Sequence, residues 1–552
     1  MSNLSGIGVS PGVVIGPIRR VIQAQATEPV PATPREVFDA LEKVAQDLEH
    51  SAMTIELEVA KEVLGAQAMM ARDPALVEAI GARLSEDAQH PDVRDPIQES
   101  IAGFKDALLA IGGYFAERVA DLDEISNRLI NKLAGTESKG VTLSTPSVIV
   151  AEDLTPADTA ALDLKYALAL VVEKGGPTSH TAIVARGLGI PAIVGCAGIL
   201  SLDEGKTILV DGREGIVIAD PSEGEVDSRR VREDALRARA AAVNGPGRLA
   251  DGTPVTLLGN AGNGDDAVSA ANVGAEGIGL FRTELLFLDS KTEPSIDEQV
   301  VMYGSVLKAM AGRKVVIRTL DAGSDKPVPY INAPHEENPA LGVRGWRLTR
   351  TSNDVLNRQL QALARAAKNA AAEGNTVEVW AMAPMINTPA EARDFAARVR
   401  ELGIGKAGVM IETPAAALHA DKVLAEVDFG SFGTNDLTQY IMASDRLDAR
   451  LSDMTSTWHP AVLRAIRIAC LYAAEHGKPM GVCGESAANP HLAAVLLGLG
   501  VNSLSMAPRA LPEVRGFLAQ VDFDKCRQAA EAAVAAGSAE EAESLAKSIL
   551  GN

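Results

Sequence analysis

The stretch Gly408-Val409-Met410-Ile411-Glu412-Thr413 decides the fold, because a short apolar run ends there abruptly in a carboxylate. It is one of eight strand-like runs that follow Leu249, and helical stretches separate them. The eight runs are Val255–Asn260, Gly277–Arg282, Val315–Asp321, Val377–Ile386, Gly408–Thr413, Phe429–Asp436, Pro479–Glu485 and Ser503–Pro508. Eight βα units in this length of chain predict a parallel (β/α)8 barrel, which typically needs about 250 residues.

Polar side chains gather at the C-terminal ends of these runs. They are Asn260, Arg282, Arg318, Asp321, Glu412, Asn435, Asp436, Cys483 and Glu485. Active sites of such barrels are built at the C-terminal ends of the strands, from residues that several strands contribute. The pattern therefore indicates an enzyme.

Two of these side chains are carboxylates on neighbouring βα units. Glu412 ends one run and Asp436 ends the next, so both can converge on one hard cation such as Mg²⁺. The alternative is that they cap helices or pair with basic side chains. Four arginines lie at or near the same ends: Arg282, Arg318, Arg344 and Arg446. Their planar guanidinium groups suit carboxylate and phosphate oxygens, which predicts a small, multiply anionic ligand.

The N-terminal region combines strands with a helical insertion. Gly6–Gly16 alternates small and β-branched residues around turn formers, which predicts strand, turn and strand. From about Pro34 to Lys132, apolar residues recur at three- and four-residue spacing and predict about four antiparallel helices. Further strand-like runs are Ser147–Ala151, Ala167–Val172, Ala192–Val194 and Thr207–Val210. We therefore expect a compact α/β unit that a helical arm interrupts.

A charged segment separates this unit from the barrel. Val226–Val243 is a highly charged helical stretch, and the breaker Asn244-Gly245-Pro246-Gly247 follows it. We place the main domain boundary at this breaker. Near the C-terminus, the Ala-rich tail Gln528–Leu550 predicts a helix without an assigned function.

The α/β unit contains a histidine in an unusual setting, within Gly175–Arg186. Two glycines free the backbone, and Thr178 or Ser179 can cap a helix that starts near His180. A helix N-terminus disfavours protonation of the imidazole and stabilises an attached phosphate. Most histidines are structural, but this setting favours a nucleophilic His180.

The four cysteines lie far apart, without a CxxC pair, which is not a disulfide framework or a zinc site and suits a reducing compartment. Cys483 follows a strand between Gly481 and Gly484, and these glycines are expected to leave its thiol accessible. On the residues alone, Cys483 can be an acid, a nucleophile or a core filler.

The charge balance excludes one class of partner and favours another. The formal net charge of −21 repels phosphate backbones, so we expect no nucleic-acid partner, and a basic protein becomes more plausible. Acidic residues outnumber basic ones about two to one in the helical arm, which fits either a solvated bundle or a docking arm. No secretory signal or membrane-spanning run is visible, so we expect a cytoplasmic protein without membrane insertion.

Taken together, these segments resemble Enzyme I of the bacterial phosphoenolpyruvate:sugar phosphotransferase system, from Gly6 to about Pro508. The string Asn435-Asp436-Leu437-Thr438-Gln439-Tyr440 is highly specific for this family. The other shared motifs are Gly6–Gly16, Asp153-Leu154-Thr155-Pro156, Thr178-Ser179-His180-Thr181, Gly277–Glu284, Glu337-Asn338-Pro339, Ile411-Glu412-Thr413-Pro414 and Cys483-Gly484-Glu485.

The resemblance implies a chemistry for the site. His180 would attack the phosphorus of phosphoenolpyruvate, with Thr159 orienting the imidazole, and Cys483 would protonate the enolate to give pyruvate. Glu412 and Asp436 would hold Mg²⁺. The substrate-binding residues would be Arg282, Arg318, Asn435, Arg446 and, less directly, Arg344. One departure is Pro177, which stands where many relatives carry Arg or Lys, and this removes a cation from the phosphorylation site.

The resemblance also implies the domain plan. Residues 1–33 and 134–220 would form a swivelling phosphohistidine α/β domain, and residues 34–133 an inserted helical subdomain that docks the phosphocarrier protein HPr through Gln67–Pro74 and Glu117–Ile125. Residues 221–248 would be a linker helix, and residues 249–552 the phosphoenolpyruvate-binding barrel, which would also form a homodimer. Because one histidine must reach both the barrel and HPr, we expect motion about Asp220–Gly247.

Three rival interpretations are weaker. Pyruvate phosphate dikinase and phosphoenolpyruvate synthase share the histidine and barrel but carry a large nucleotide-binding domain, and no P-loop is evident here. A nitrogen-related paralogue of Enzyme I normally has an additional sensor domain before the α/β unit. A signalling module that is phosphorylated once, without sustained turnover, is disfavoured because His180, Glu412, Asp436 and Cys483 are all present.

Overall fold

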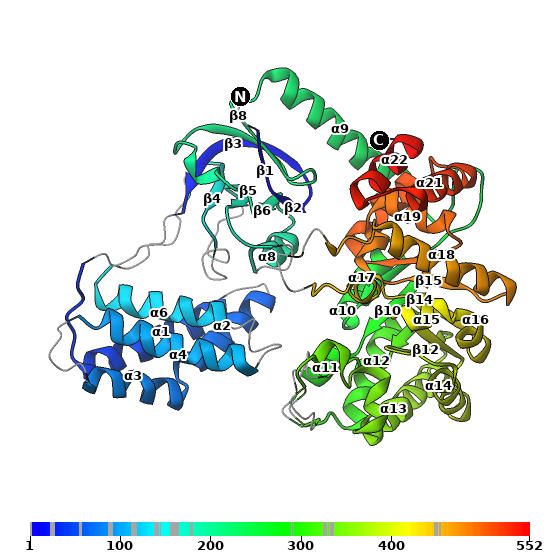
Figure 1. Cartoon of the computed structure of the whole chain (residues 1–552), viewed down its shortest axis with the longest axis horizontal. Coiled ribbons are helices and arrows are strands. Elements are labelled where there is room, and N and C mark those ends of the chain that lie inside the picture. Colours follow the sequence, from blue (N-terminus) through cyan, green and yellow to red (C-terminus); the bar gives the residue numbers. More distant parts are fainter. Residues whose placement is uncertain are drawn as a thin grey trace. The chain divides into compact units, whose positions relative to one another are not determined.

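The computed structural model consists of two compact units, residues 1–235 and 236–552, which are described separately. Their elements are shown in Figure 1. The structure describes residues 3–21, 28–54, 58–86, 92–111, 119–136, 143, 145–154, 165–176, 180–288, 290, 292–323, 328, 330–331, 336–446, 451 and 454–551. The two units divide inside helix α9 (Glu223–Ala242), whereas the sequence places a boundary at Asn244–Gly247.

The first unit contains an eight-stranded mixed sheet in the order β1-β8-β7-β3-β4-β5-β6-β2. Its strands are β1 (Asn3–Ser5), β2 (Ile7–Ser10), β3 (Val13–Arg20), β4 (Ser147–Ala151), β5 (Ala167–Val172), β6 (Ala192–Val194), β7 (Thr207–Asp211) and β8 (Ile216–Ala219). Strands β3 to β6 pair in parallel, and β4 is buried along its whole length. Residues on both faces of such a strand are apolar, which is why its sequence is a continuous hydrophobic run. The α/β fold is confirmed, although β1 and β8 were not expected.

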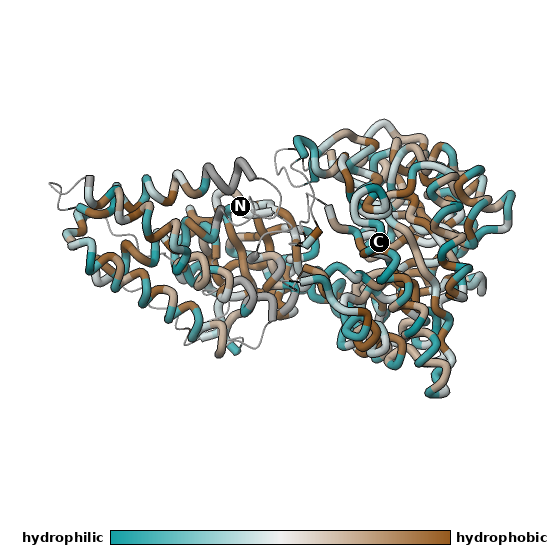
Figure 2. Tube along the Cα trace, turned by 90° about the horizontal axis from the view of Figure 1, so that it is seen from below, coloured by the Kyte–Doolittle hydropathy of each residue, from teal (hydrophilic) through white to brown (hydrophobic). Residues whose placement is uncertain are grey.

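The helical insertion lies between β3 and β4 in the chain. Its described helices are α1 (Pro34–Thr54), α2 (Glu58–Ala71), α3 (Pro74–Glu86), α4 (Arg94–Ile111) and α6 (Val119–Leu133). Their apolar residues meet in a shared core. Figure 2 shows hydrophobic and hydrophilic residues alternating along helical stretches of the chain. The described part of the arm thus contains five helices where about four were expected, and no proline separates α1 from α2.

The second unit is a closed barrel of eight parallel strands, in the order β9 to β16 with β16 pairing back to β9. The strands are β9 (Thr256–Ala261), β10 (Gly277–Arg282), β11 (Lys314–Arg318), β12 (Glu378–Ala383), β13 (Lys406–Ile411), β14 (Phe429–Phe432), β15 (Met480–Val482) and β16 (Ser503–Met506). Each coincides with one of the eight runs, so the barrel prediction is confirmed. Asp436 is a correction, because it lies in the first turn of helix α17 and not at the end of β14.

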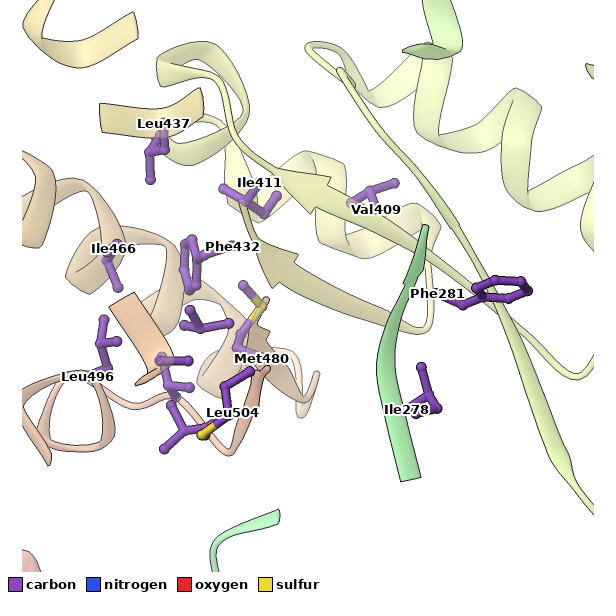
Figure 3. Close-up of a cluster of buried hydrophobic side chains, with 14 of the residues drawn as sticks. Ile278, Phe281, Val409, Ile411, Phe432, Leu437, Ile466, Met480, Leu496 and Leu504 are labelled. Atoms are coloured by element: carbon purple, nitrogen blue, oxygen red, sulfur yellow. The ribbon is translucent and has the colours of Figure 1, made fainter. Parts of the chain in front are cut away.

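Helices cover the outside of this barrel. They are α10 (Gly264–Asn272), α11 (Glu284–Leu288), α12 (Ile296–Ala309), α13 (Asn353–Ala372), α14 (Pro389–Glu401), α15 (Pro414–Leu418), α16 (Ala420–Val423), α17 (Thr434–Met442), α18 (Pro460–Glu475), α19 (Pro490–Gly498), α20 (Leu511–Leu518), α21 (Phe523–Ala535) and α22 (Ala539–Leu550). Side chains such as Ile411, Phe432 and Leu504 fill the layer between strands and helices (Figure 3). The Ala-rich tail is helical, as expected. Within the described part of the chain, no helix has the length and apolarity needed to cross a membrane.

Candidate active site

Strand alternation explains why two predicted site residues face the barrel interior. On β11, Val315 and Ile317 belong to the outer core, whereas Val316 belongs to the separate interior cluster. Because side chains alternate along a strand, Arg318 at the end of β11 points inward. On β13, Met410 likewise lies in the interior cluster, and Glu412 follows two positions later, so it faces the same way.

The guanidinium group of Arg318 is buried among carboxylates. Its Nη2 lies 3.0 Å from Oε2 of Glu284, and its Nη1 lies 3.5 Å from Oδ2 of Asp321. Burial opposes the charge, but the attraction of Glu284, Asp321 and Glu412 outweighs it and raises the pKa of Arg318 further. Arg318 therefore carries a permanent positive charge inside the barrel. Glu284 belongs to the Gly277–Glu284 motif, but its role as a partner of Arg318 was not predicted from the sequence.

Arg344 connects two acids that lie far apart in the sequence. It precedes the 3₁₀ helix η3 (Gly345–Arg350), and only 1% of its surface is exposed. Its Nε and Nη2 donate to the two carboxylate oxygens of Asp321 at 3.1 and 2.7 Å, and its Nη1 donates to Oδ1 of Asp436 at 3.2 Å. Arg344 is thus a buried structural cation that holds Asp436 in place.

Glu412 is fully buried and only half satisfied. Its Oε1 accepts a hydrogen bond from the backbone N–H of Met385 at 2.6 Å, whereas its Oε2 has no hydrogen-bond partner within the described residues. Met385 adopts a left-handed φ of +57°, which is uncommon for a residue with a side chain. Burial, reinforced by the nearby carboxylates of Asp436 and Asp321, raises the pKa of Glu412 to about 8, although Arg318 and Arg344 oppose this.

The other predicted ligand-binding residues surround this charged group. Arg282 ends β10 beside Arg318 in the strand ladder, and its side chain is exposed. Asn435 is half-buried one residue before Asp436 in α17. Nη1 of Arg446 lies 3.6 Å from Oδ2 of Asp436. The structure therefore brings Arg318, Arg344, Arg446, Glu412 and Asp436 together, with Arg282 next to Arg318.

Cys483 lies directly after β15, in the interior cluster of the barrel. Only 2% of its surface is exposed, so the expectation of an accessible thiol is wrong. The neighbouring Gly484 instead permits close packing, because a Cβ there would lie 2.0 Å from Oγ1 of Thr434. Burial raises the pKa of the Cys483 thiol, although a hydrogen bond with Ser431 opposes this. Cys483 is therefore a protonated thiol at neutral pH, which suits an acid better than a nucleophile.

The donor set of the carboxylates fits one divalent cation. Among the described residues, no group of three or more His, Cys, Asp or Glu side chains is arranged so that it could hold a metal ion by itself. Glu412, however, keeps a buried and unpartnered Oε2, and the backbone of Gly433 approaches it so closely that a Cβ there would lie 2.4 Å from that oxygen. Mg²⁺ is commonly held by one or two carboxylates, with waters and substrate phosphates completing its coordination. Glu412 and Asp436 fit this pattern.

The predicted nucleophile lies in the first unit. Helix α8 (His180–Leu188) begins at His180, as the sequence predicts. Oγ1 of the buried Thr181 lies 3.2 Å from both Oδ1 of Asp153 and the carbonyl oxygen of Leu154, so it ties this helix to the Asp153–Pro156 motif. Thr159 and residues 177–179 lie outside the described residues, and so does the side chain of His180.

Three family models match the chain. They describe the PEP-binding domain of PEP-utilising enzymes at residues 237–523, the mobile domain of these enzymes at residues 143–215 and their N-terminal domain at residues 5–118. PEP denotes phosphoenolpyruvate. The barrel and its charged mouth therefore belong to a PEP-utilising enzyme, a class that generally needs a divalent metal.

Whole-length relatives narrow this class. A phosphoenolpyruvate-protein phosphotransferase of Streptomyces coelicolor is 45% identical over 100% of this chain and 99% of its own length. Proteins of the same name from Haloferax volcanii (39% identical, 85% of this chain and 83% of that one) and Bacillus subtilis (34% identical, 99% of each) are also similar. The chain belongs to the phosphoenolpyruvate-protein phosphotransferase family, which is Enzyme I, as the motifs predicted.

Proposed function

We infer that the chain transfers the phosphoryl group of phosphoenolpyruvate to His180 and then to a histidine of HPr, with release of pyruvate. This is the first step of the sugar phosphotransferase system. The observation that supports it best is the arrangement at the barrel mouth. There, a partly unsatisfied Glu412 accompanies an Asp436 that Arg344 holds in place, Arg446 lies beside Asp436, and Arg282 ends the strand next to Arg318. Such a site offers both anion-binding groups and ligands for a cation.

We assign the substrate contacts to side chains that retain donor capacity. Arg282 has no hydrogen bond or ion pair with any described residue, and Arg446 is partly exposed with only a 3.6 Å contact to Asp436. These two groups, with Asn435, would bind phosphate and carboxylate oxygens directly. Arg318 would add a positive charge from the interior of the barrel. Its own ion pairs fix the position of its guanidinium group before substrate arrives, which lowers the cost of reorganisation during transfer.

Glu412 and Asp436 would hold Mg²⁺, which when bound supplies positive charge against the phosphoryl oxygens. In the transfer itself, an imidazole nitrogen of His180 forms a bond to phosphorus as the bond from phosphorus to the enol oxygen breaks. The enolate of pyruvate leaves with the electron pair of that bond. Position at a helix N-terminus favours the neutral, nucleophilic imidazole and then stabilises the phosphorylated product.

Cys483 completes the reaction as the proton donor. Its Sγ–H gives a proton to the methylene carbon of the enolate, which becomes the methyl group of pyruvate, and the thiolate recovers a proton from solvent after pyruvate has left. The buried position favours this role, because burial raises the thiol pKa and keeps the proton on sulfur until an acceptor arrives. The interior cluster around Cys483 also excludes water from the carbanion.

The helical insertion is our proposed docking site for HPr. In the predicted segment Gln67–Pro74, Gln67 is not available for contact, because it is 1% exposed and its Nε2 donates to Asp121 at 2.8 Å. Met69, in contrast, is 72% exposed on α2, and Met53 is 80% exposed on α1. Exposed methionines adapt to partner surfaces, and the surrounding acidic excess complements a basic carrier.

The remaining parts of the proposal concern organisation. Residues 1–33 and 134–220 would carry the phosphohistidine, residues 34–133 would dock HPr, residues 221–248 would act as the linker, and residues 249–552 would bind phosphoenolpyruvate. Motion about Asp220–Gly247 and a homodimer through the barrel belong to the same proposal. So does a cytoplasmic location, which four free, buried cysteines support.

A coupled assay of pyruvate release tests this function. The full chain is mixed with phosphoenolpyruvate and Mg²⁺, with or without purified HPr. We expect a stoichiometric burst of pyruvate without HPr and sustained release with it. A single burst in both conditions would instead support a signalling module. The absence of a burst would contradict phosphoryl transfer altogether.

A further inference from the structure

A buried glutamine on a helix outside the barrel joins two loops of the site. Gln359 lies on α13, and only 2% of its surface is exposed. Its Oε1 accepts a hydrogen bond from the backbone N–H of Leu320 at 2.8 Å, and its Nε2 donates to Oγ1 of Thr283 at 3.0 Å. Thr283 in turn donates to the carbonyl oxygen of Arg318 at 3.0 Å. One amide thus bridges the segments that follow β10 and β11.

These bonds have a fixed direction. The N–H of Leu320 can only donate and the carbonyl oxygen of Arg318 can only accept, so the amide of Gln359 can adopt only one orientation between them. Nε2 of Gln359 also lies 3.3 Å from the hydroxyl of Tyr303, which donates to Oε1 of Gln299 at 3.0 Å. Gln299 ends the chain of bonds by donating to the carbonyl oxygen of Pro294 at 3.0 Å.

The bridged segments carry the two strand-end arginines. Arg282 directly precedes Thr283, and Arg318 lies two residues before Leu320. Arg282 and Arg318 are also partners in the β10–β11 ladder. The strands therefore hold these residues on one side, and Gln359 holds the two loops immediately beyond them. Glu284 adds a second bridge, because its Oε1 accepts from the N–H of Asp321 at 2.8 Å.

We propose that Gln359 is a positioning residue for phosphoryl transfer, which keeps the guanidinium groups of Arg282 and Arg318 at the separation that the substrate needs. The proposal rests on the proposed function, since it takes Arg282 as a substrate contact and Arg318 as the fixed positive charge beside it. Gln359 does not touch substrate. It acts through Thr283 and the backbone of the Arg318–Asp321 segment, and a displacement of about 1 Å at such a site can cost about 100-fold in rate.

Two substitutions separate shape from hydrogen bonding. Gln359→Met keeps nearly the same length and volume but removes the donor and the acceptor. Gln359→Glu keeps the acceptor for Leu320 but removes the donor, so the hydroxyl of Thr283 turns toward the carboxyl group and releases the carbonyl oxygen of Arg318. Both variants should therefore loosen the Arg318–Asp321 segment.

The test is steady-state kinetics on the full chain with phosphoenolpyruvate, Mg²⁺ and HPr, corrected for active sites by single-turnover labelling. We expect kcat/KM for phosphoenolpyruvate to fall by about 10–100-fold in Gln359→Met, with KM raised several-fold. Loss of stability alone reduces the number of folded molecules but leaves KM unchanged. The KM value therefore separates a positioning role from a structural one.

Tyr303→Phe is the matched control, since it removes the hydroxyl group that bonds to Gln299 and to Gln359 but leaves the contacts of Gln359 with Leu320 and Thr283. We expect it to lower the melting temperature and keep KM within about twofold. Thr283→Val should reproduce the KM effect and Thr283→Ser should restore it. The Gln359→Met/Thr283→Val double variant should be no worse than either single variant, because both break one unit.

The proposal is overturned if Gln359→Met loses stability with an unchanged KM, or if Tyr303→Phe raises KM as much. Failure of the underlying function would look different. In that case the unsubstituted chain itself would give no pyruvate burst with phosphoenolpyruvate and Mg²⁺.

Discussion

At the carboxyl end of the barrel strands, Arg344 lies buried between Asp321 and Asp436, and Glu412 keeps one buried oxygen without a partner. At the amino end, the ammonium groups of Lys314 and Lys406 lie 4.5 and 4.3 Å from the ring centroid of Trp380. The rings of Trp380 and Phe429 also pack against each other, with centroids 4.8 Å apart. Both ends carry charge, but in different environments.

This difference between the two ends of the barrel indicates that one end serves stability and the other serves function. Lys406 is exposed, so its stem can cover the aromatic ring while its charged end stays near water, whereas burial lowers the pKa of Lys314. The carboxyl end instead holds ionised groups away from water, where each depends on its partners. A barrel selected for stability alone would not retain the unsatisfied Glu412, whose pKa burial raises to about 8. The charged residues at the carboxyl end are therefore explained by ligand binding rather than by stability.

The largest loss of stability is expected when Arg344 is replaced. In Arg344→Leu, the carboxylates of Asp321 and Asp436 lose a buried counterion, which should lower the free energy of unfolding by about 3–5 kcal/mol. Turnover should fall by about 1,000-fold or more, because Asp436 is no longer held in place. Urea unfolding and pyruvate release measure the two effects. Unchanged stability of Arg344→Leu would contradict the role of Arg344 as the buried counterion of Asp321 and Asp436.

Replacing Glu412 is expected to change stability by a smaller amount, and to raise it rather than lower it. Its folded-state pKa of about 8 exceeds the ordinary value of 4.5, so the folded protein binds the extra proton between these pH values. Wild-type stability without metal should therefore fall as pH rises from about 4.5 to 8. Glu412→Gln removes this loss and should be more stable at pH 8 by roughly 2–4 kcal/mol, yet inactive.

The same variant at pH 5 is the control for Glu412. Both proteins then have a neutral side chain at this position in the folded state, so their melting temperatures should nearly coincide. A stability difference that does not depend on pH would contradict the ionisation argument. Mg²⁺ titrations at pH 8 should stabilise the wild type and leave Glu412→Gln unaffected.

The smallest effect is expected at the amino end. Lys406→Gln removes one of the two ammonium groups over Trp380 and should cost only about 0.5–1 kcal/mol of stability. Turnover should match the wild type within about twofold, since residues at this end of a barrel contribute to stability rather than catalysis. A large loss of turnover would erase the functional difference between the two ends.

Much of this site was predictable, because strand period and strand ends are local properties of the sequence. The inward positions of Arg318 and Glu412 follow from alternation along β11 and β13. The start of α8 at His180 follows from capping chemistry and turn-forming residues. The eight barrel strands follow from short apolar runs that end in polar residues.

The features that could not be predicted from the sequence depend on contacts between distant segments. Arg344 lies in irregular structure, and its role appears only when Asp321 and Asp436 fold against it. Gln359 is one polar residue in an amphipathic helix, and nothing in its neighbours indicates a bridge between two strand ends. The expectation of an accessible Cys483 thiol was wrong for a related reason, because adjacent glycines permit exposure and close packing equally well.

The most direct test of the account is to locate the phosphoryl group. The full chain is incubated with phosphoenolpyruvate and Mg²⁺, and the acid-labile modification is mapped by tandem mass spectrometry at neutral to mildly basic pH. The account predicts modification of His180 alone, lost in His180→Ala and in Glu412→Gln but retained at the normal rate in Lys406→Gln. Phosphorylation at another residue, or undiminished labelling of His180→Ala, would contradict it.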